Sequence, residues 1–256
     1  MNAILEVAEV ELSFGGVRAL DGPSFTVGEG EIVGLIGPNG AGKTSLFNCI
    51  NGLYRPQSGM IRVGGRHVIG MPRHRITDLG VSRTFQNIGL LMSQTVLENV
   101  MAGTYHVSHG GYWATALALP QVKRSERSQR ASAMAVLDAL GLAGAADVPV
   151  AVLPFGTLKR VELARALVSE PRLLLIDEPA NGLIHSEVLE LADTIRRLAR
   201  ERGTAILLVE HHMALVMRVC DRVVVLNLGR KIAEGEPADV ANDPAVVAAY
   251  LGGAAA

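Results

Sequence analysis

The residues Gly37–Ser45, which read GPNGAGKTS, have the types and spacing needed to hold phosphate groups. Gly37, Gly42, Lys43 and Thr44 satisfy the pattern G-x-x-x-x-G-K-[ST]. The glycines permit backbone angles that aim successive N–H groups at one point, where phosphate oxygens accept them beside the positive end of a helix. Lys43 adds a charge for the β- and γ-phosphates, and the Thr44 hydroxyl is a ligand for Mg²⁺. The pattern predicts ATP binding, and a glycine-rich turn without a ligand is the alternative.

A second group of candidate residues consists of two adjacent carboxylates. Leu173–Pro179 reads LLLIDEP, so an apolar strand delivers Asp177 and Glu178 to its carboxyl end, where ligands gather in open parallel sheets. We expect Asp177 to assist Mg²⁺ through its water shell and Glu178 to polarise a water molecule against the γ-phosphate. The simpler alternative is an acidic cap at the start of a helix, which the phosphate loop in the same chain disfavours.

Two further polar residues follow strand-like or core segments. His211 comes after an apolar run in LLVEHHM, and Gln86 lies in RTFQN where the core gives way to a helical segment. A histidine after a strand is usually structural, but three apolar runs that each end in polar groups favour a γ-phosphate contact for His211. We interpret its neighbour His212 as incidental. Gln86 suits an Mg²⁺ ligand, although spacing alone leaves a structural role equally open.

Short apolar runs recur along the chain, and helical stretches separate them. Runs of this kind fit central strands that are buried on both faces, and their alternation with helices predicts an α/β fold with a largely parallel sheet. The expected central strands are Ile32–Ile36, Leu173–Ile176, Ala205–Val209 and Val223–Leu226. The expected helices are Ser45–Gly52, Leu158–Ser169 and Ser186–Arg202, and the expected antiparallel strands are Ile4–Phe14, Ser24–Val27, Met60–Val63 and Lys231–Glu234.

The segment 87–156 differs from the rest of the chain, because it lacks strand-like runs and is rich in Ala, Leu, Ser and Arg. We predict that it is a helical subdomain inserted into a nucleotide-binding core formed by residues 1–86 and 157–256. The stretch Lys123–Arg130, KRSERSQR, is interpreted as a solvated helix face, with a polyanion site as the alternative.

Composition narrows the function classes. The 24 basic and 25 acidic residues nearly balance, which disfavours a nucleic-acid binder. Two cysteines without metal-like spacing indicate no disulfide framework and fit a reducing cytosol. The N-terminus carries acidic residues where a signal peptide is basic, and no run approaches the roughly 20 apolar residues that span a bilayer. We therefore expect neither a signal peptide nor a transmembrane helix, and attribute the mean hydropathy of +0.29 to a buried sheet.

These motifs in this order resemble the ATP-binding cassette family: Walker A, a glutamine loop, a signature stretch, Walker B in LLLIDEP and a switch histidine. More narrowly, the chain resembles the ATPase subunits of branched-chain amino acid importers. The resemblance covers essentially the whole chain and is carried by SRTFQNIGLL (82–91), TVLENVMAG (95–103), the stretch 208–240 and NDPAVVAAYLG (242–252). It implies a P-loop NTPase with a RecA-like core, an antiparallel β subdomain and an inserted helical subdomain.

The resemblance also implies roles for individual residues. Phe14 would stack on adenine with Val17 nearby, Gln86 would be the glutamine-loop residue, Glu178 the catalytic base and His211 the switch. The expected nucleotide-binding residues are Phe14, Gly37, Pro38, Asn39, Gly40, Ala41, Gly42, Lys43, Thr44 and Ser45, with Leu153, Phe155, Gly156 and Thr157 acting on the nucleotide of a partner. The expected catalytic residues are Lys43, Gln86, Glu178 and His211, and the expected Mg²⁺ ligands are Thr44, Gln86 and Asp177.

The family implies an assembly as well. Such ATPases form head-to-tail dimers in which each ATP lies between one phosphate loop and the signature motif of the partner. We expect a second ATPase subunit as that partner, with a homodimer as the alternative. Two integral membrane permease subunits and an external solute-binding protein complete the importer, and residues 87–113 would contact the permeases. This places the chain at the cytoplasmic face of the inner membrane as a peripheral subunit, without nucleic acid.

Two positions depart from the family pattern. The signature, commonly LSGGQ, reads LPFGT here, and Pro154 offers neither a hydroxyl nor an N–H. Gly156 keeps its N–H, and the following helix keeps its dipole. Ile184 replaces a polar residue in the loop after Walker B, where it cannot form the usual hydrogen bond. Because of Pro154 we expect a weaker nucleotide site in the partner, whereas the site at Lys43 is spared. For Ile184 we expect either packing against the partner or reduced coupling across the dimer.

The sequence is compatible with three functions. The leading hypothesis is an ATP-hydrolysing importer subunit whose motions pass through the helical insert to the membrane subunits. The alternative is a nucleotide-gated assembly subunit with weak hydrolysis, which Pro154 and Ile184 motivate. A cassette ATPase acting on DNA or ribosomes fits least, because such proteins usually carry coiled-coil insertions or two cassettes and the charge here is neutral.

Overall fold

A computed structural model of the chain describes residues 3–84, 89–104 and 120–252. The chain divides into two compact units, one formed by Met1–Arg83 with Arg172–Ala256 and the other by Thr84–Pro171. The sequence placed the return to the core at residue 157, whereas helix α6 (Phe155–Leu167) groups with the helical unit. The physical reason is that α6 packs against the other helices of that unit. Gln86 lies outside the described residues.

A six-stranded sheet forms the centre of the first unit, in the order β11-β10-β4-β9-β8-β7. All neighbours are parallel except β11, which runs antiparallel to β10. The strands are β4 (Ile32–Ile36), β7 (Val81–Arg83), β8 (Leu173–Asp177), β9 (Ala205–Val209), β10 (Arg222–Asn227) and β11 (Arg230–Gly235). Every residue of β4, β8 and β9 is buried, which confirms the prediction of central strands. Strand β7 was not predicted, because three residues at a sheet edge leave no periodic signal.

A second, antiparallel sheet belongs to the same unit, with the order β2-β1-β5-β6 and with β3 paired to β1. Its strands are β1 (Ala3–Phe14), β2 (Val17–Asp21), β3 (Phe25–Gly28), β5 (Ser58–Val63) and β6 (Arg66–His67). This confirms the predicted antiparallel strands in the first 63 residues. The predicted strand 231–234 is also antiparallel, but it pairs with β10 in the central sheet.

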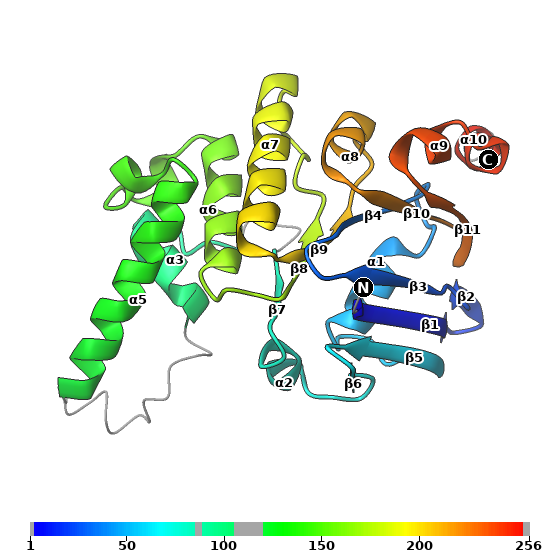
Figure 1. Ribbon diagram of the computed structural model, residues 1–256, viewed down its shortest axis with the longest axis horizontal. Helices are drawn as coiled ribbons and strands as arrows, with labels where there is room; N and C mark the ends of the chain where they lie inside the picture. Colours follow the sequence, from blue (N-terminus) through cyan, green and yellow to red (C-terminus); the bar gives the residue numbers. More distant parts are fainter. Residues whose placement is uncertain (1–2, 85–88, 105–119, 253–256) are drawn as a thin grey trace. The chain divides into compact units, whose positions relative to one another are not determined.

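Helices cover the central sheet on both faces (Figure 1). Helix α1 lies between the two sheets, and its residues Leu46, Phe47 and Ile50 are fully buried in the shared core. Helices α7 and α8 pack together on the opposite face. The helices of this unit are α1 (Lys43–Ile50), α2 (Arg73–Thr77), α7 (His185–Arg202), α8 (Met213–Val219), α9 (Pro237–Ala241) and α10 (Pro244–Gly252). Burying an apolar side chain of this size contributes roughly 1.5–3 kcal/mol, so α1 is firmly fixed.

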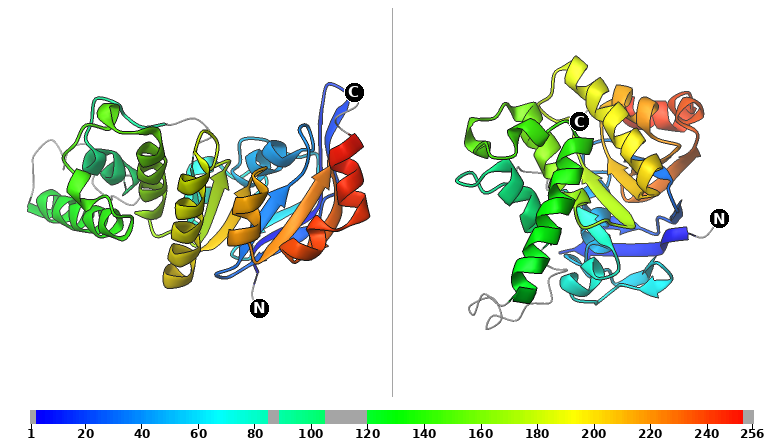
Figure 2. Two further views of the ribbon diagram at one scale, coloured as in Figure 1. Left: turned by 90° about the horizontal axis from the view of Figure 1, so that it is seen from above. Right: turned by 60° about the vertical axis from the view of Figure 1, so that its left-hand side comes forward.

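The helical unit is built from α3 (Val96–Met101), α5 (Pro120–Ala139) and α6, which pack against one another (Figure 2). Short 3-10 turns join them: η1 (Ala102–Thr104), η2 (Ala143–Ala145) and η3 (Val150–Val152). Helix α3 starts in a capping box, in which Thr95 and Glu98 each accept the backbone N–H of the other. On α5, residues 126–128 and 130 are exposed, which confirms the solvated helix face for the described part of that stretch.

Both cysteines are buried free thiols. Burial raises the pKa of Cys49 and that of Cys220 to about 12, so both stay protonated and unreactive at neutral pH. Within the described ranges, no helix combines the length and the apolar character needed to cross a membrane.

Candidate functional site

The three strands that precede the candidate residues are direct neighbours, since β9 lies between β4 and β8. All three are parallel, so their carboxyl ends meet at one edge of the sheet. Gly37 follows β4, Glu178 follows β8, and His211 comes two residues after β9. The topology therefore brings the phosphate loop, the acidic pair and the histidine to one place.

The phosphate loop packs closely against the backbone of β10 and β2. Gly37 has φ 150°, and a Cβ atom there would lie 2.1 Å from the carbonyl oxygen of Leu226 on β10. Gly42 has φ 100°, and a Cβ atom there would lie 2.5 Å from the carbonyl oxygen of Ala19 on β2. Neither position accommodates a side chain, so the two motif glycines are sterically required. Of the loop residues between them, Asn39 and Gly40 are exposed.

Lys43 begins α1 and is only 9% exposed. Its Nζ donates hydrogen bonds to the carbonyl oxygens of Gly37 at 2.7 Å and Pro38 at 3.0 Å, so the charge is held inside the loop. Burial lowers the pKa of the Lys43 ammonium, while the charges of Glu178 and Asp177 act in the opposite direction. The lysine and both carboxylates therefore share one electrostatic site.

Asp177 is fixed by an arginine that sequence analysis did not single out. The carboxylate is 1% exposed and accepts a hydrogen bond of 2.7 Å from Nη2 of Arg83, the last residue of β7. Nη1 of Arg83 donates to Oδ1 of Asn48 at 2.8 Å, and the guanidinium lies 5.4 Å from the ring centre of Phe47. Arg83 thus joins the Walker B aspartate to α1. Its only sequence signal was its place in SRTFQ, three residues before Gln86.

Glu178 has an unusual backbone conformation for a non-glycine residue, with φ 46°. Its N–H donates to the carbonyl oxygen of Val209 at 2.9 Å, which anchors it at the end of β9. Strain of this kind costs of order 1–3 kcal/mol and gathers at functional sites. Nδ1 of His211 lies 3.9 Å from Oε1 of Glu178, so the predicted base and the predicted switch are neighbours.

A second residue that sequence analysis missed, Glu210, holds this histidine loop. Its side chain is fully buried and accepts three backbone N–H groups. Oε1 accepts from Ala180 at 3.0 Å, and Oε2 accepts from His211 at 2.6 Å and from His212 at 2.8 Å. Glu210 therefore ties the loop after β9 to the loop after β8. The available signal was a carboxylate at the end of a wholly apolar strand in LLVEHHM.

The predicted adenine platform lies at the end of β1. Phe14 is 46% exposed, and its ring meets that of Tyr54 edge-on with 5.1 Å between centroids. Val17, opposite Phe14 across the hairpin, is 70% exposed. The side chain of Gln57 bonds both backbone groups of Ser13, accepting from the N–H at 3.0 Å and donating to the carbonyl at 3.1 Å. Tyr54 and Gln57, neither anticipated, hold an exposed aromatic face in place.

The signature stretch starts helix α6 in the helical unit. Pro154 is the N-cap residue and makes no side-chain cap, and its carbonyl oxygen accepts the N–H of Thr157 at 3.0 Å. Gly156 is buried, whereas the Phe155 ring is 44% exposed and lies 5.6 Å from Nζ of Lys159. The start of this helix therefore exposes an aromatic ring beside the exposed Pro154. Leu153, the remaining signature residue, is half-buried.

Ile184, the second departure from the family pattern, is 66% exposed at the start of α7. Its N–H donates to Oε2 of Glu187 at 3.1 Å, which is one half of a capping box, but the isoleucine side chain has no acceptor for the N–H of Glu187. An exposed apolar side chain is thus presented where the family pattern has a hydrogen-bonding group.

Thr44 and Asp177 are the described candidate oxygen ligands for Mg²⁺ at this site. In the described part of the chain, no group of three or more His, Cys, Asp or Glu side chains could hold a metal ion by itself. Mg²⁺ at nucleotide sites usually keeps several waters and takes one or two protein oxygens plus phosphate oxygens. The exposed Thr44 on α1 and the buried Asp177 at the end of β8 fit that requirement.

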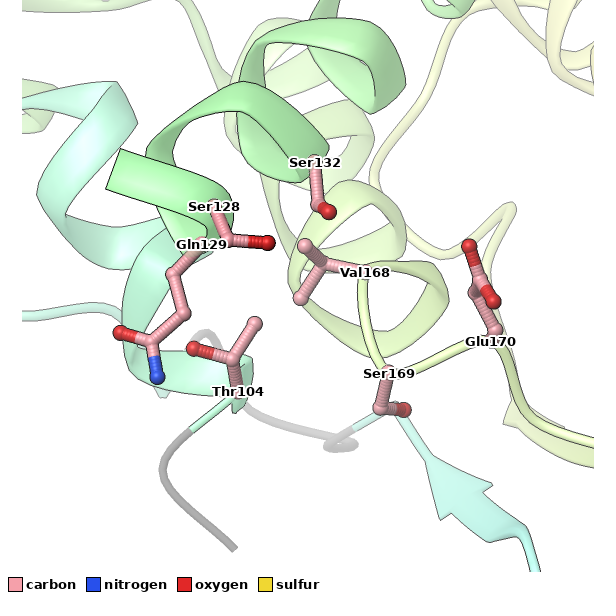
Figure 3. A pocket seen from close by; sticks show the side chains of 7 residues that line it. All are labelled: Thr104, Ser128, Gln129, Ser132, Val168, Ser169 and Glu170. Carbon is pink, nitrogen blue, oxygen red and sulfur yellow. The ribbon is translucent and has the colours of Figure 1, made fainter. Parts of the chain in front are cut away.

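The helical unit contains a separate pocket with a volume of about 280 Å³ (Figure 3). It is lined by residues of η1, of α5 and of the segment that directly follows α6: Thr104, Ser128, Gln129, Ser132, Val168, Ser169 and Glu170. Figure 3 shows mainly hydroxyl and amide groups around Val168, and none of the lining residues is cationic. This pocket therefore lacks the charge needed to hold phosphate groups.

A glycine-rich loop between a parallel strand and a helix, with a buried lysine and two carboxylates from a nearby strand, defines a P-loop nucleoside triphosphatase. The profile of the family described as ABC transporter matches residues 20–181. A second profile, described as branched-chain amino acid ATP-binding cassette transporter, matches residues 230–256. The chain belongs to the ABC transporter family, and it is an ATP-binding subunit that hydrolyses ATP.

Curated relatives and solved structures agree with this assignment. The chain is 39% identical over 249 residues to the high-affinity branched-chain amino acid transport ATP-binding protein BraF of Pseudomonas aeruginosa, covering 97% of this chain and 98% of the relative. LivG of Escherichia coli, which carries the same description, is 39% identical over the same coverage. The ADP conformation of MJ1267, an ATP-binding cassette of an ABC transporter, superposes with a TM-score of 0.86 at 29% identity, covering 98% of this chain and 100% of that one.

Removing the arginine that holds Asp177 should strongly destabilise the fold. We expect Arg83→Ala to lower the free energy of unfolding by roughly 3–5 kcal/mol, because it strips a buried carboxylate of its ion pair. Chemical denaturation measures this loss. Arg172→Ala is the matched control, since its ion pair with Glu29 is 57% and 61% exposed. Equal losses in the two variants would contradict a special role for Arg83.

Neutralising Glu210 should disturb the histidine loop. We expect Glu210→Gln to lose at least one of three backbone hydrogen bonds, because its amide nitrogen cannot accept an N–H. The free energy of unfolding should fall by about 1–3 kcal/mol, and the steady-state ATPase rate of the assembled complex should fall with it. Glu201→Gln, at the exposed end of α7, is the control and should change neither quantity. Wild-type hydrolysis by Glu210→Gln would show that this carboxylate does not position His211.

Proposed function

We propose that the chain energises an importer of branched-chain amino acids or related small solutes. The observation that carries the proposal is the meeting of Lys43, Asp177, Glu178 and His211 at one edge of the parallel sheet. Near-complete coverage of relatives described as branched-chain amino acid transport ATP-binding proteins supports the solute class. The match of residues 230–256 to a branched-chain amino acid cassette profile supports it independently.

The roles proposed for the site follow from its geometry. The loop from Gly37 to Ser45 holds the phosphates, and Lys43 exchanges its carbonyl partners for phosphate oxygens when nucleotide enters. When bound, Mg²⁺ neutralises charge on the β- and γ-phosphates, and Thr44 and Asp177 would hold it. Glu178 orients and deprotonates the attacking water, and His211 contacts the γ-phosphate. Phe14 supports the adenine ring.

The proposed assembly contains a second ATPase subunit and two integral membrane permease subunits, with an external solute-binding protein. In that assembly the signature residues Leu153, Phe155, Gly156 and Thr157 face the nucleotide of the partner ATPase. The side chains of Leu91 and Met92 are 50% and 48% exposed, which suits contact with a permease. We place the chain at the cytoplasmic face of the inner membrane as a peripheral subunit.

The catalytic assignment is tested by one isosteric substitution. Glu178→Gln should reduce ATP hydrolysis by roughly 100-fold or more, because the amide cannot accept the proton of the attacking water. Nucleotide affinity should stay unchanged, since the loop and Lys43 are intact. Lys43→Ala is the contrasting variant and should abolish tight nucleotide binding. An unchanged hydrolysis rate for Glu178→Gln in the assembled complex would remove Glu178 from its proposed role.

The assembly is tested by purification from membranes. A tagged chain should retain multi-spanning membrane subunits, and vesicles reconstituted with that complex should accumulate leucine, isoleucine or valine only when ATP and a solute-binding protein are supplied. Leu91→Asp should release the membrane subunits while the isolated chain binds nucleotide as before, because a carboxylate cannot be buried in an apolar contact without cost. Recovery of nucleic acid in place of membrane subunits would overturn the proposal.

A further inference from the structure

A backbone segment of the helical unit, residues 89–92, is held by buried polar side chains on two different helices. Its first residue, Gly89, stands three positions after Gln86 in the sequence. The N–H of Gly89 donates to Oε1 of Glu162 at 3.0 Å, and its carbonyl oxygen accepts from the Arg165 guanidinium. Both acceptor and donor lie on α6, the helix that begins with the signature stretch.

The second attachment lies two residues further along. Asn99 on α3 is fully buried; its Oδ1 accepts the N–H of Leu91 at 2.7 Å, and its Nδ2 donates to the carbonyl oxygen of Leu91 at 3.1 Å. Alternate residues of the segment, Gly89 and Leu91, are therefore hydrogen-bonded through both their N–H and their carbonyl groups, as in a strand paired along one edge. Leu90 is buried, and Leu91 and Met92 present exposed side chains.

The contacts that α6 makes with this segment involve buried charged side chains. Glu162 is 3% exposed, and burial raises the pKa of its carboxyl, while the Gly89 N–H, Lys159 and Arg165 act to lower it. Lys159 is itself 8% exposed and lies 5.6 Å from the ring of Phe155. A row of interacting groups thus runs along α6 from the exposed signature ring to the backbone of Gly89. A buried charge of this kind is costly unless its partners are fixed, so the row keeps one geometry.

We propose that Glu162 is a positioning residue that locks the exposed Leu91–Met92 segment to the signature helix, so that movement of α6 is passed to whatever that segment contacts. The inference rests on the proposed function for the identity of that contact, a membrane subunit. Glu162 touches neither nucleotide nor water in this role. Substitution of Glu162 should therefore reduce transport while ATP hydrolysis continues, because the nucleotide site in the other unit stays intact.

The lock is tested first in the isolated chain. Glu162→Gln keeps the shape and replaces a charged acceptor by a neutral one, and Glu162→Ala removes the acceptor. Hydrogen–deuterium exchange of the Gly89 amide should accelerate by about tenfold or more in Glu162→Ala and by less in Glu162→Gln. Glu126→Gln, an exposed glutamate on α5, is the matched control and should exchange at the wild-type rate. Wild-type exchange at Gly89 in both Glu162 variants would overturn the proposal.

The coupling is tested in the reconstituted complex by the number of solute molecules transported per ATP hydrolysed. In Glu162→Gln this ratio should fall several-fold while KM for ATP and the hydrolysis rate remain close to wild type. A parallel fall of transport and hydrolysis would assign Glu162 a merely structural role and sink the inference. If the wild-type complex hydrolyses ATP without moving any solute, the proposed function fails, and the exchange measurement on Gly89 still decides the lock.

Discussion

The parallel pairing of β4, β9 and β8 is the constraint on which the site depends. Every residue of these three strands is buried, and Asp177, the last residue of β8, is their only polar residue, so the candidate chemistry lies at or beyond the last residues of the strands. Parallel neighbours end at the same edge, which places the phosphate loop, the histidine loop and the acidic pair together. Three short apolar runs far apart in the sequence thereby produce one composite site.

Buried carboxylates then fix the parts of the molecule that must keep their geometry. Asp177 is paired with Arg83, Glu210 accepts three backbone N–H groups, and Glu162 accepts one from Gly89 beside two cations. A buried charge tolerates little movement, because each lost partner leaves a desolvated group. The first holds the proposed metal-binding acid to α1, the second holds the histidine loop, and the third holds an exposed apolar segment. Stability is thus tied to functional geometry in both units.

The chain has a complete phosphate loop for its own nucleotide, whereas its signature motif, which is proposed to face the nucleotide of a partner, departs from the family pattern. Its phosphate loop keeps both required glycines and a lysine already held by loop carbonyls. Its signature helix begins at a proline without a side-chain cap and exposes the ring of Phe155. Ile184 exposes a second apolar side chain at the start of α7. The proposed heterodimer gives this inequality a physical meaning, because the two nucleotides then meet different signature motifs.

Part of the candidate site could be predicted from the sequence, and part could not. The apolar runs predicted β4, β8 and β9, since continuous burial leaves a local signature, and Gly37 and Lys43 were recognisable from spacing alone. Arg83 and Glu210 were missed because their importance comes from partners 94 and 30 residues away along the chain. The edge strand β7 and the grouping of α6 with the helical unit were likewise set by packing.

The sequence by itself determined the phosphate loop, the acidic pair and the alternation of central strands with helices along the chain, because each is encoded by residues adjacent along the chain. Only the tertiary structure decided how those residues are held. It showed a lysine bound by its own loop, an aspartate tied to α1 through Arg83, and a histidine loop fixed by Glu210. The physical reason is that buried polar groups select their partners by distance in space, and spacing in the sequence does not specify that distance.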